Sequence, residues 1–128
     1  MSAMSDYLEN EILDHILSVG SFTMPSAVYL GLSVASMADD ASGTELAGSG
    51  YARQAVPFSA AASGTTSNSG AITFPTATGT WGSIGFWSLW DALSSGNMLL
   101  HGSFSAAKSI ASGDVLRVSA GDLDITAA

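Results

Sequence analysis

The sequence predicts an α+β fold that is mainly β, with a short N-terminal helix followed by an antiparallel β-sandwich or jelly-roll-like domain. Near the N-terminus, apolar residues recur every three or four positions, and beyond it the period changes to two. Clusters of Gly, Ser, Asn and Asp then recur about every 8–12 residues, as in sandwiches and jelly rolls. The length of 128 residues suits a single domain, 1–128, with the helix at 6–19 and the sandwich at 27–126.

The helix is expected to begin at Asp6, whose carboxylate can cap it while Glu9, three residues later, completes a capping box. Gly20 would end it. An apolar stripe follows one face, at Leu8, Ile12, Ile16 and Val19, and Leu13 and Leu17 widen it. This stripe makes the helix a candidate docking element, and packing against its own sheet is the alternative.

The strands are expected to be short and separated by turns. Candidate strands lie at 27–34, 51–57, 71–75, 81–92, 98–104 and, as one or two strands, 115–126. The segment 81–92 has large apolar side chains on both faces, which is typical of a central strand. It pairs with 98–104 as a hairpin, whereas 36–50 is a long loop and 59–70 a flexible connection.

The composition excludes several classes of function. Only 11% of the residues are charged, against about 25% in an ordinary domain, so either the surface is neutral or copies and partners cover it. Three Lys and Arg residues against a net charge of −8 argue against binding to nucleic acid or to anionic lipid. The chain has no cysteine and no apolar run long enough to span a membrane.

No arrangement of residues predicts a catalytic, cofactor or metal site. His15 and His101 are far apart in the sequence and are interpreted as a helix-surface residue and a strand residue with a satisfied ring. Asp39, Asp40 and Glu45 could supply oxygen ligands to calcium, but a solvated acidic loop is the preferred interpretation. The serines include no nucleophile elbow, so we expect no enzyme activity.

Three tryptophans and one arginine are candidates for interactions. Trp87 and Trp90, together with Trp81, are interpreted as core or subunit-interface residues, with a sugar-stacking platform as the alternative. Because few cations face many acids, each cation is expected to find a carboxylate. Arg53 is expected at a strand edge, paired with Asp91 or Glu45 within or between subunits.

The chain as a whole resembles a family of small structural proteins of tailed bacteriophages, described as tail-fibre-like or virion proteins. The resemblance runs from about Tyr7 to Ile125, and its most specific segments are "GYARQAVPF", "SNSGAITFP" and "GDL". None of these is a catalytic signature, so the resemblance implies a role in a particle rather than a reaction.

The resemblance implies a self-associating protein on the outer surface of the virion, made in the cytoplasm of the bacterial host. It would serve as a capsid decoration (cement) protein or as a tail-fibre module; the alternative is a carbohydrate-binding, receptor-recognition module. Expected partners are further copies, most simply in a trimer, a major capsid or tail protein, and possible host-surface glycans. The interface candidates are Leu8, Ile12, Ile16, Arg53, Trp87 and Trp90.

Overall fold

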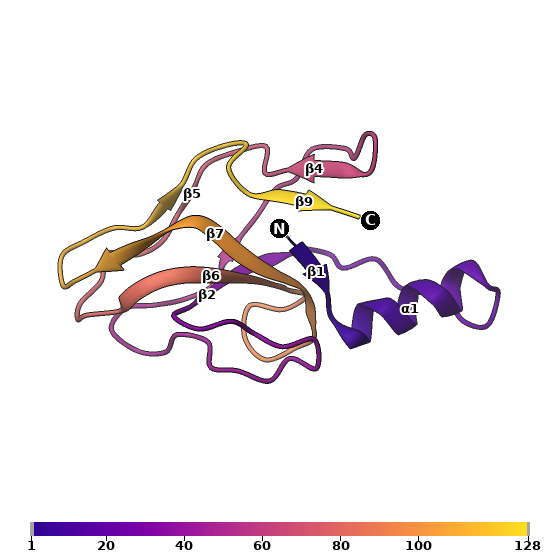
Figure 1. Cartoon of the computed structure of the whole chain (residues 1–128), viewed down its shortest axis with the longest axis horizontal. Coiled ribbons are helices and arrows are strands. Elements are labelled where there is room, and N and C mark those ends of the chain that lie inside the picture. The colour runs from indigo at the N-terminus through magenta and orange to yellow at the C-terminus, as the bar shows by residue number, and fades with distance from the viewer. Residues whose placement is uncertain (1, 128) are drawn as a thin grey trace.

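The computed structural model describes residues 2–127, which form one helix and nine strands (Figure 1). In chain order the elements are β1 (Ser2–Met4), α1 (Asp6–Ile16), β2 (Tyr29–Ser33), β3 (Gln54–Ala55), β4 (Thr65–Ser67), β5 (Ile72–Thr73), β6 (Gly82–Trp90), β7 (Met98–Ile110), β8 (Arg117–Val118) and β9 (Asp124–Thr126). The predicted α+β, mainly β class is confirmed.

The main sheet contains five antiparallel strands in the order β1-β7-β6-β2-β3. β6 lies between β7 and β2, as predicted for a strand with large apolar side chains on both faces. Leu30 lies opposite Leu89, and Leu32 lies opposite Trp87. The predicted hairpin is formed by β6 and β7, although β7 continues to Ile110, well past the predicted end of this strand.

Two short ribbons, β4 with β9 and β5 with β8, form a second layer above the main sheet in Figure 1. The core lies between the layers and includes Leu30, Leu32, Ile72, Phe74, Ile84, Trp87, Leu89, Leu116, Val118 and Leu123. The sandwich therefore consists of one large sheet and two small ribbons, rather than two sheets of similar size.

The helix is shorter than predicted, and a different residue caps it. Ser5, not Asp6, is the N-cap, and its hydroxyl accepts the N–H of Leu8. The helix ends at Ile16 rather than at 19, because Ser18 adopts a left-handed φ of 65° and the N–H of Val19 donates to the carbonyl of Asp14. This is a Schellman closure with serine where glycine is usual.

The segment 59–70, predicted to be a flexible connection, contains β4. Ser63 and Gly64 take φ values of 53° and 75°, which are typical of the tight turns that join hairpin strands. Ala62 and Thr65 exchange backbone hydrogen bonds across this turn. The polar composition of the segment shows no alternation and therefore did not indicate a strand.

The predicted strand at 51–57 is reduced to the two residues of β3, because other groups occupy the edge of β2. The carbonyl of Leu32 accepts the N–H of Leu46, and the N–H of Leu32 donates to the hydroxyl of Tyr51. The N–H and the carbonyl of Leu32, which a longer β3 would need for backbone pairing, therefore already have other hydrogen-bond partners.

Within residues 2–127, no helix combines the length and the apolar character that crossing a membrane requires.

Candidate interaction surfaces

Arg53 lies immediately before β3 and forms a buried ion pair with Glu45. Its Nε donates to the two carboxylate oxygens at 3.1 and 2.9 Å, and its Nη2 lies 2.7 Å from Oε1. Its Nη1 donates to the carbonyls of Ala92 and Ser95, each at 2.8 Å. The guanidinium also lies 3.9 Å from the centre of the Trp90 ring. The pair predicted with Glu45 is thus present within one chain.

The surroundings of this pair are closely packed. A Cβ on Gly31 would lie 2.8 Å from a Glu45 carboxylate oxygen, so a larger residue at this position would push the carboxylate out of its place in the pair. The hydroxyl of Tyr51 donates to the same carboxylate. Burial and the Glu45 charge raise the pKa of Tyr51 above its ordinary value. Because every buried side-chain nitrogen or oxygen in residues 2–127 has a hydrogen-bond partner, this network is a structural clamp rather than a vacant ligand site.

The two histidines lie in different environments, and only His101 contacts the acidic loop. His15 is exposed and accepts the N–H of Phe22, whereas His101 Nε2 lies 2.7 Å from Asp39 Oδ1. Hydrogen bonding from the side chain and then from the backbone N–H of Ser42 holds the pKa of the Asp40 carboxyl below its usual value. The interpretations of both histidines are confirmed. Residues 2–127 contain no cluster of three or more His, Asp or Glu side chains that could hold a metal ion.

All three tryptophans are buried within the chain. The indole N–H of Trp81 donates to the carbonyl of Ser49, and that of Trp90 donates to the hydroxyl of Ser88. Because stacking on a sugar ring needs an exposed indole face, the structure does not favour the sugar-platform alternative at these residues.

The stripe on α1 becomes steadily more exposed along the helix. Leu8 is 8% exposed and packs in the molecule, Ile12 is half-buried, and Ile16 is 67% exposed. The gradient arises because the helix projects beyond the sheet (Figure 1). Of the predicted interface residues, Ile16 has the exposure that a contact residue needs. Four others are covered by their own chain: Leu8, Arg53, Trp87 and Trp90.

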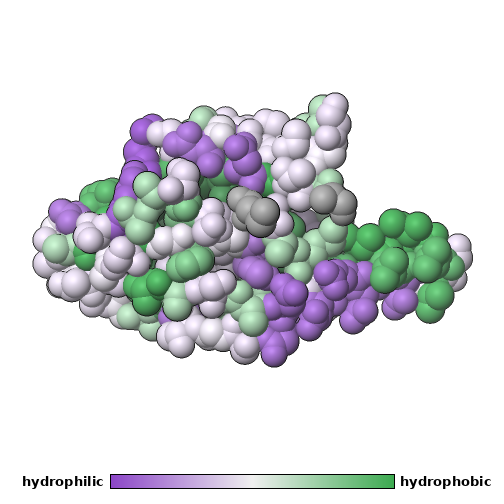
Figure 2. Space-filling model, viewed as in Figure 1, coloured by the Kyte–Doolittle hydropathy of each residue, from purple (hydrophilic) through white to green (hydrophobic). Residues whose placement is uncertain are grey.

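The free end of α1 and the loop after it carry an exposed apolar cluster, which we call the tip. The tip consists of Leu13, Ile16, Leu17, Val19 and Met24, which are between 55% and 82% exposed. Figure 2 shows the hydrophobic tip at one end of the molecule, beside the hydrophilic surface of the helix. The helical period indicated most of the tip, but Met24 lies beyond the predicted helix and was not singled out.

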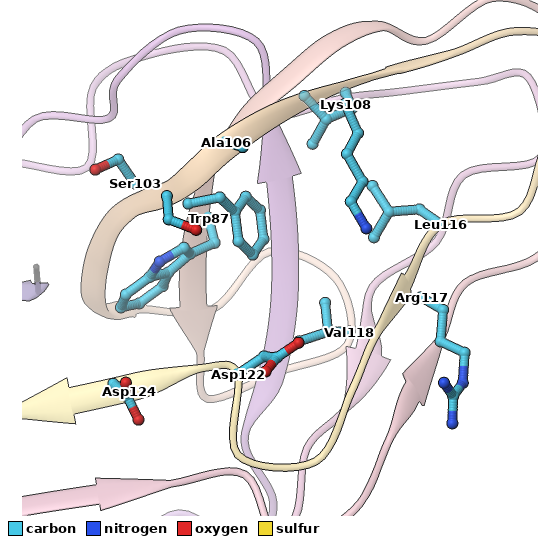
Figure 3. A pocket seen from close by; sticks show the side chains of 12 residues that line it. Trp87, Ser103, Ala106, Lys108, Leu116, Arg117, Val118, Asp122 and Asp124 are labelled. Atoms are coloured by element: carbon cyan, nitrogen blue, oxygen red, sulfur yellow. The ribbon is translucent and has the colours of Figure 1, made fainter.

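A cleft of about 460 Å³ lies between β7 and the segments that carry β8 and β9 (Figure 3). It forms because β7 bulges away from β6: Ile84 pairs with Lys108 and Phe86 with Ser103, so four residues of β7 span a single residue of β6. The lining of the cleft is mixed: it combines serines and four charged side chains with apolar residues, at Ile84, Trp87, Phe104, Leu116 and Val118. The sequence pattern did not predict the cleft, because a bulge has no fixed signature.

Lys108 and Arg117 lie at one end of this cleft, and Asp122 and Asp124 lie at the other (Figure 3). Within residues 2–127 neither cation forms an ion pair, although the charge balance predicted a carboxylate for each. Arg53 is buried, so both exposed Lys and Arg side chains of this acidic chain lie at the cleft.

Comparison with known proteins agrees with the resemblance to phage virion proteins. No curated protein shows significant similarity to the chain. A family model, described as podophage GP4 fiber I protein gp80, matches residues 3–126. The match covers nearly the whole chain and includes α1, both layers of strands, the tip and the cleft. The chain therefore belongs to the family of the podophage GP4 fiber I protein gp80, a family of phage fibre proteins.

Proposed function

We propose that this protein is a non-enzymatic, self-associating module of a tail fibre, exposed on the outer surface of the phage particle. Membership of a fibre family supports a structural role. The observation that carries the proposal is the tip, where five large apolar side chains lie together in solvent. Contiguous apolar surface of this kind marks a site of contact with another protein.

The area of the tip sets the strength of the contact. Complete burial of one large aliphatic side chain is worth about 1.5–3 kcal/mol. Because the tip side chains are 55% to 82% exposed, covering all five would be worth on the order of 5–10 kcal/mol. Association costs about 4–15 kcal/mol. One tip contact is therefore marginal, and a stable assembly needs several contacts in a closed ring.

A trimer is the simplest such ring, because each subunit supplies one contact and receives another. A low fraction of charged residues suits subunits that cover one another, as does a tip that would otherwise remain in water. In the particle, the fibre would attach to a tail protein. The capsid decoration alternative requires attachment to the major capsid protein.

Light scattering across a concentration series tests self-association. We expect the wild-type mass to rise to that of a trimer, while Leu17→Asp in the tip stays monomeric. Leu93→Asp is the matched control, because Leu93 is 57% exposed but lies outside the tip; it should assemble like the wild type. A wild-type protein that stays monomeric at its highest soluble concentration would contradict self-association.

Electron microscopy of virions labelled with antibody tests the location. Gold particles confined to the tail would support a fibre module, whereas gold distributed over the head would favour the decoration role.

A further inference from the structure

The tip and the cleft lie apart in the molecule. In Figure 1 the free end of α1 is at one extreme of the longest axis, whereas β7 and β9, whose segments line the cleft, lie with the two layers of strands. The tip of one chain therefore cannot fill the cleft of the same chain, and any contact between them joins two copies.

The cleft has both the room and the apolar groups to receive part of the tip. The tip presents aliphatic side chains, and the cleft offers apolar lining residues such as Phe104 and Leu116 between its polar and charged ones. Its volume of about 460 Å³ lies within the range of about 300–1,000 Å³ that is typical of sites holding a bound group. Filling the cleft with tip side chains would release its water and remove both apolar surfaces from solvent.

Charge determines how the helix would lie. Asp14 is exposed one turn before Leu17, at the base of the tip, and Glu11 precedes it on the same helix. Lys108 and Arg117 are the exposed cations that an acidic helix could meet on a second copy. Asp122 and Asp124 would repel this helix from the other end of the cleft. The acidic side of α1 would thus face the end of the cleft that carries Lys108 and Arg117.

We propose that the tip of one copy inserts into the cleft of the next, with Asp14 beside Lys108 and Arg117. The inference rests on the self-association proposed above and names the surface that receives the tip. Such a contact is heterologous, because it joins two different patches, and it closes into a ring when the rotation between copies permits. A tip-to-tip contact would instead be symmetric and would stop at a dimer.

Two broken variants that complement each other distinguish these arrangements. Leu17→Asp spoils the tip and keeps the cleft, whereas the double variant Lys108→Glu/Arg117→Glu spoils the cleft and keeps the tip. We expect each alone to weaken association at least about tenfold. Because a single contact is marginal, an equimolar mixture at high concentration should form a weak 1:1 heterodimer through the one intact contact, which neither variant forms alone. Native mass spectrometry resolves the heterodimer if one variant is isotopically labelled.

Other results would overturn the inference and separate it from self-association. If the cleft variant assembles like the wild type while the tip variant does not, self-association stands and the cleft is not the receiving surface. Binding of an acidic polysaccharide that is lost in this normally assembling cleft variant would assign the cleft to a glycan instead. A wild type that is itself monomeric would refute self-association and, with it, insertion of the tip into the cleft.

Cross-linking gives a second test that does not depend on charge reversal. The chain has no cysteine, so Leu17→Cys and Ala106→Cys introduce single thiols at the tip and at the cleft lining. We expect the oxidised mixture of these two variants to form far more mixed disulfide than a mixture of Leu17→Cys with Leu93→Cys. Equal yields from the two mixtures would refute insertion of the tip into the cleft.

Discussion

Replacing Arg53 by methionine tests how much the buried ion pair with Glu45 contributes to the stability of the fold. The substitution keeps an unbranched side chain of useful volume over Trp90 and removes the charge and all its N–H donors. It leaves the Glu45 carboxylate with the Tyr51 hydroxyl, and it leaves the carbonyls of Ala92 and Ser95 without their donor.

The structure sets the size of the expected effect. Arg53 is 7% exposed and Glu45 is 18% exposed, so water can replace few of the hydrogen bonds that the substitution removes. Breaking a buried pair by removing one partner costs about 3–5 kcal/mol. The partial exposure of Glu45 places Arg53→Met near the lower limit, at about 3 kcal/mol. This is a large share of a total stability of about 5–15 kcal/mol.

Urea unfolding followed by tryptophan fluorescence measures this loss, at a protein concentration where every variant is monomeric. Arg117→Met is the matched control, because Arg117 is exposed and reaches only the Ser119 hydroxyl at 3.5 Å; it should change stability by less than about 0.5 kcal/mol. In a double-mutant cycle, Glu45→Met should cost much less once Arg53 is already methionine. A loss below about 1 kcal/mol for Arg53→Met, or two strictly additive effects, would refute the clamp.

Three further predictions concern the fold. Asn68→Ala removes two amide donations, to the carbonyls of Gly70 and Ser119, and the acceptor of the Leu123 N–H; we expect urea unfolding to show a loss of about 2–4 kcal/mol, and a loss below 1 kcal/mol would contradict it. Ser5→Ala removes the helix cap and should cost about 1–2 kcal/mol in thermal unfolding followed by circular dichroism; an unchanged melting temperature would be inconsistent with the cap. The raised pKa of Tyr51 keeps the folded hydroxyl protonated while the unfolded one ionises near pH 10. Stability should therefore be full below about pH 10 and fall above it by up to about 1.4 kcal/mol per pH unit, and an equally steep fall in Tyr51→Phe would exclude this cause.

The sequence limited the partner of Arg53 to two acidic residues but could not decide between them. Charge counting gave Asp91 and Glu45 as candidates, because acids outnumber cations in this chain. Glu45 was the partner, and Asp91 instead accepts hydrogen bonds from Asn97 across the turn after β6. The choice depends on how the aperiodic loop 36–50 crosses the sheet, and no local pattern encodes that path.

Regular elements were predicted where the sequence shows a period or a run of large apolar residues, and missed where side-chain or turn contacts decide. The segments that became α1 and β2 carried a clear period, those that became β6 and the start of β7 were rich in large apolar residues, and the structure places an element at each. β1 and β4 are too short to show a period, and tertiary pairing with β7 and β9 creates them. Local propensity is a weak guide for such edge strands, because their hydrogen bonds come from distant residues.

The helix shows why the interaction surface could be only half predicted. A period of 3.6 residues indicates that one face of a helix is apolar, but it does not indicate what covers that face. In this chain the sheet reaches Leu8 and stops short of Ile16, so a single stripe contributes to the core at one end and to the tip at the other. The sequence contains the whole stripe, but the point at which cover ends depends on the length of β7 and the position of β1. If the protein associates as proposed, the residues of the stripe that the sheet leaves uncovered are the ones at which substitution should change assembly without changing the fold.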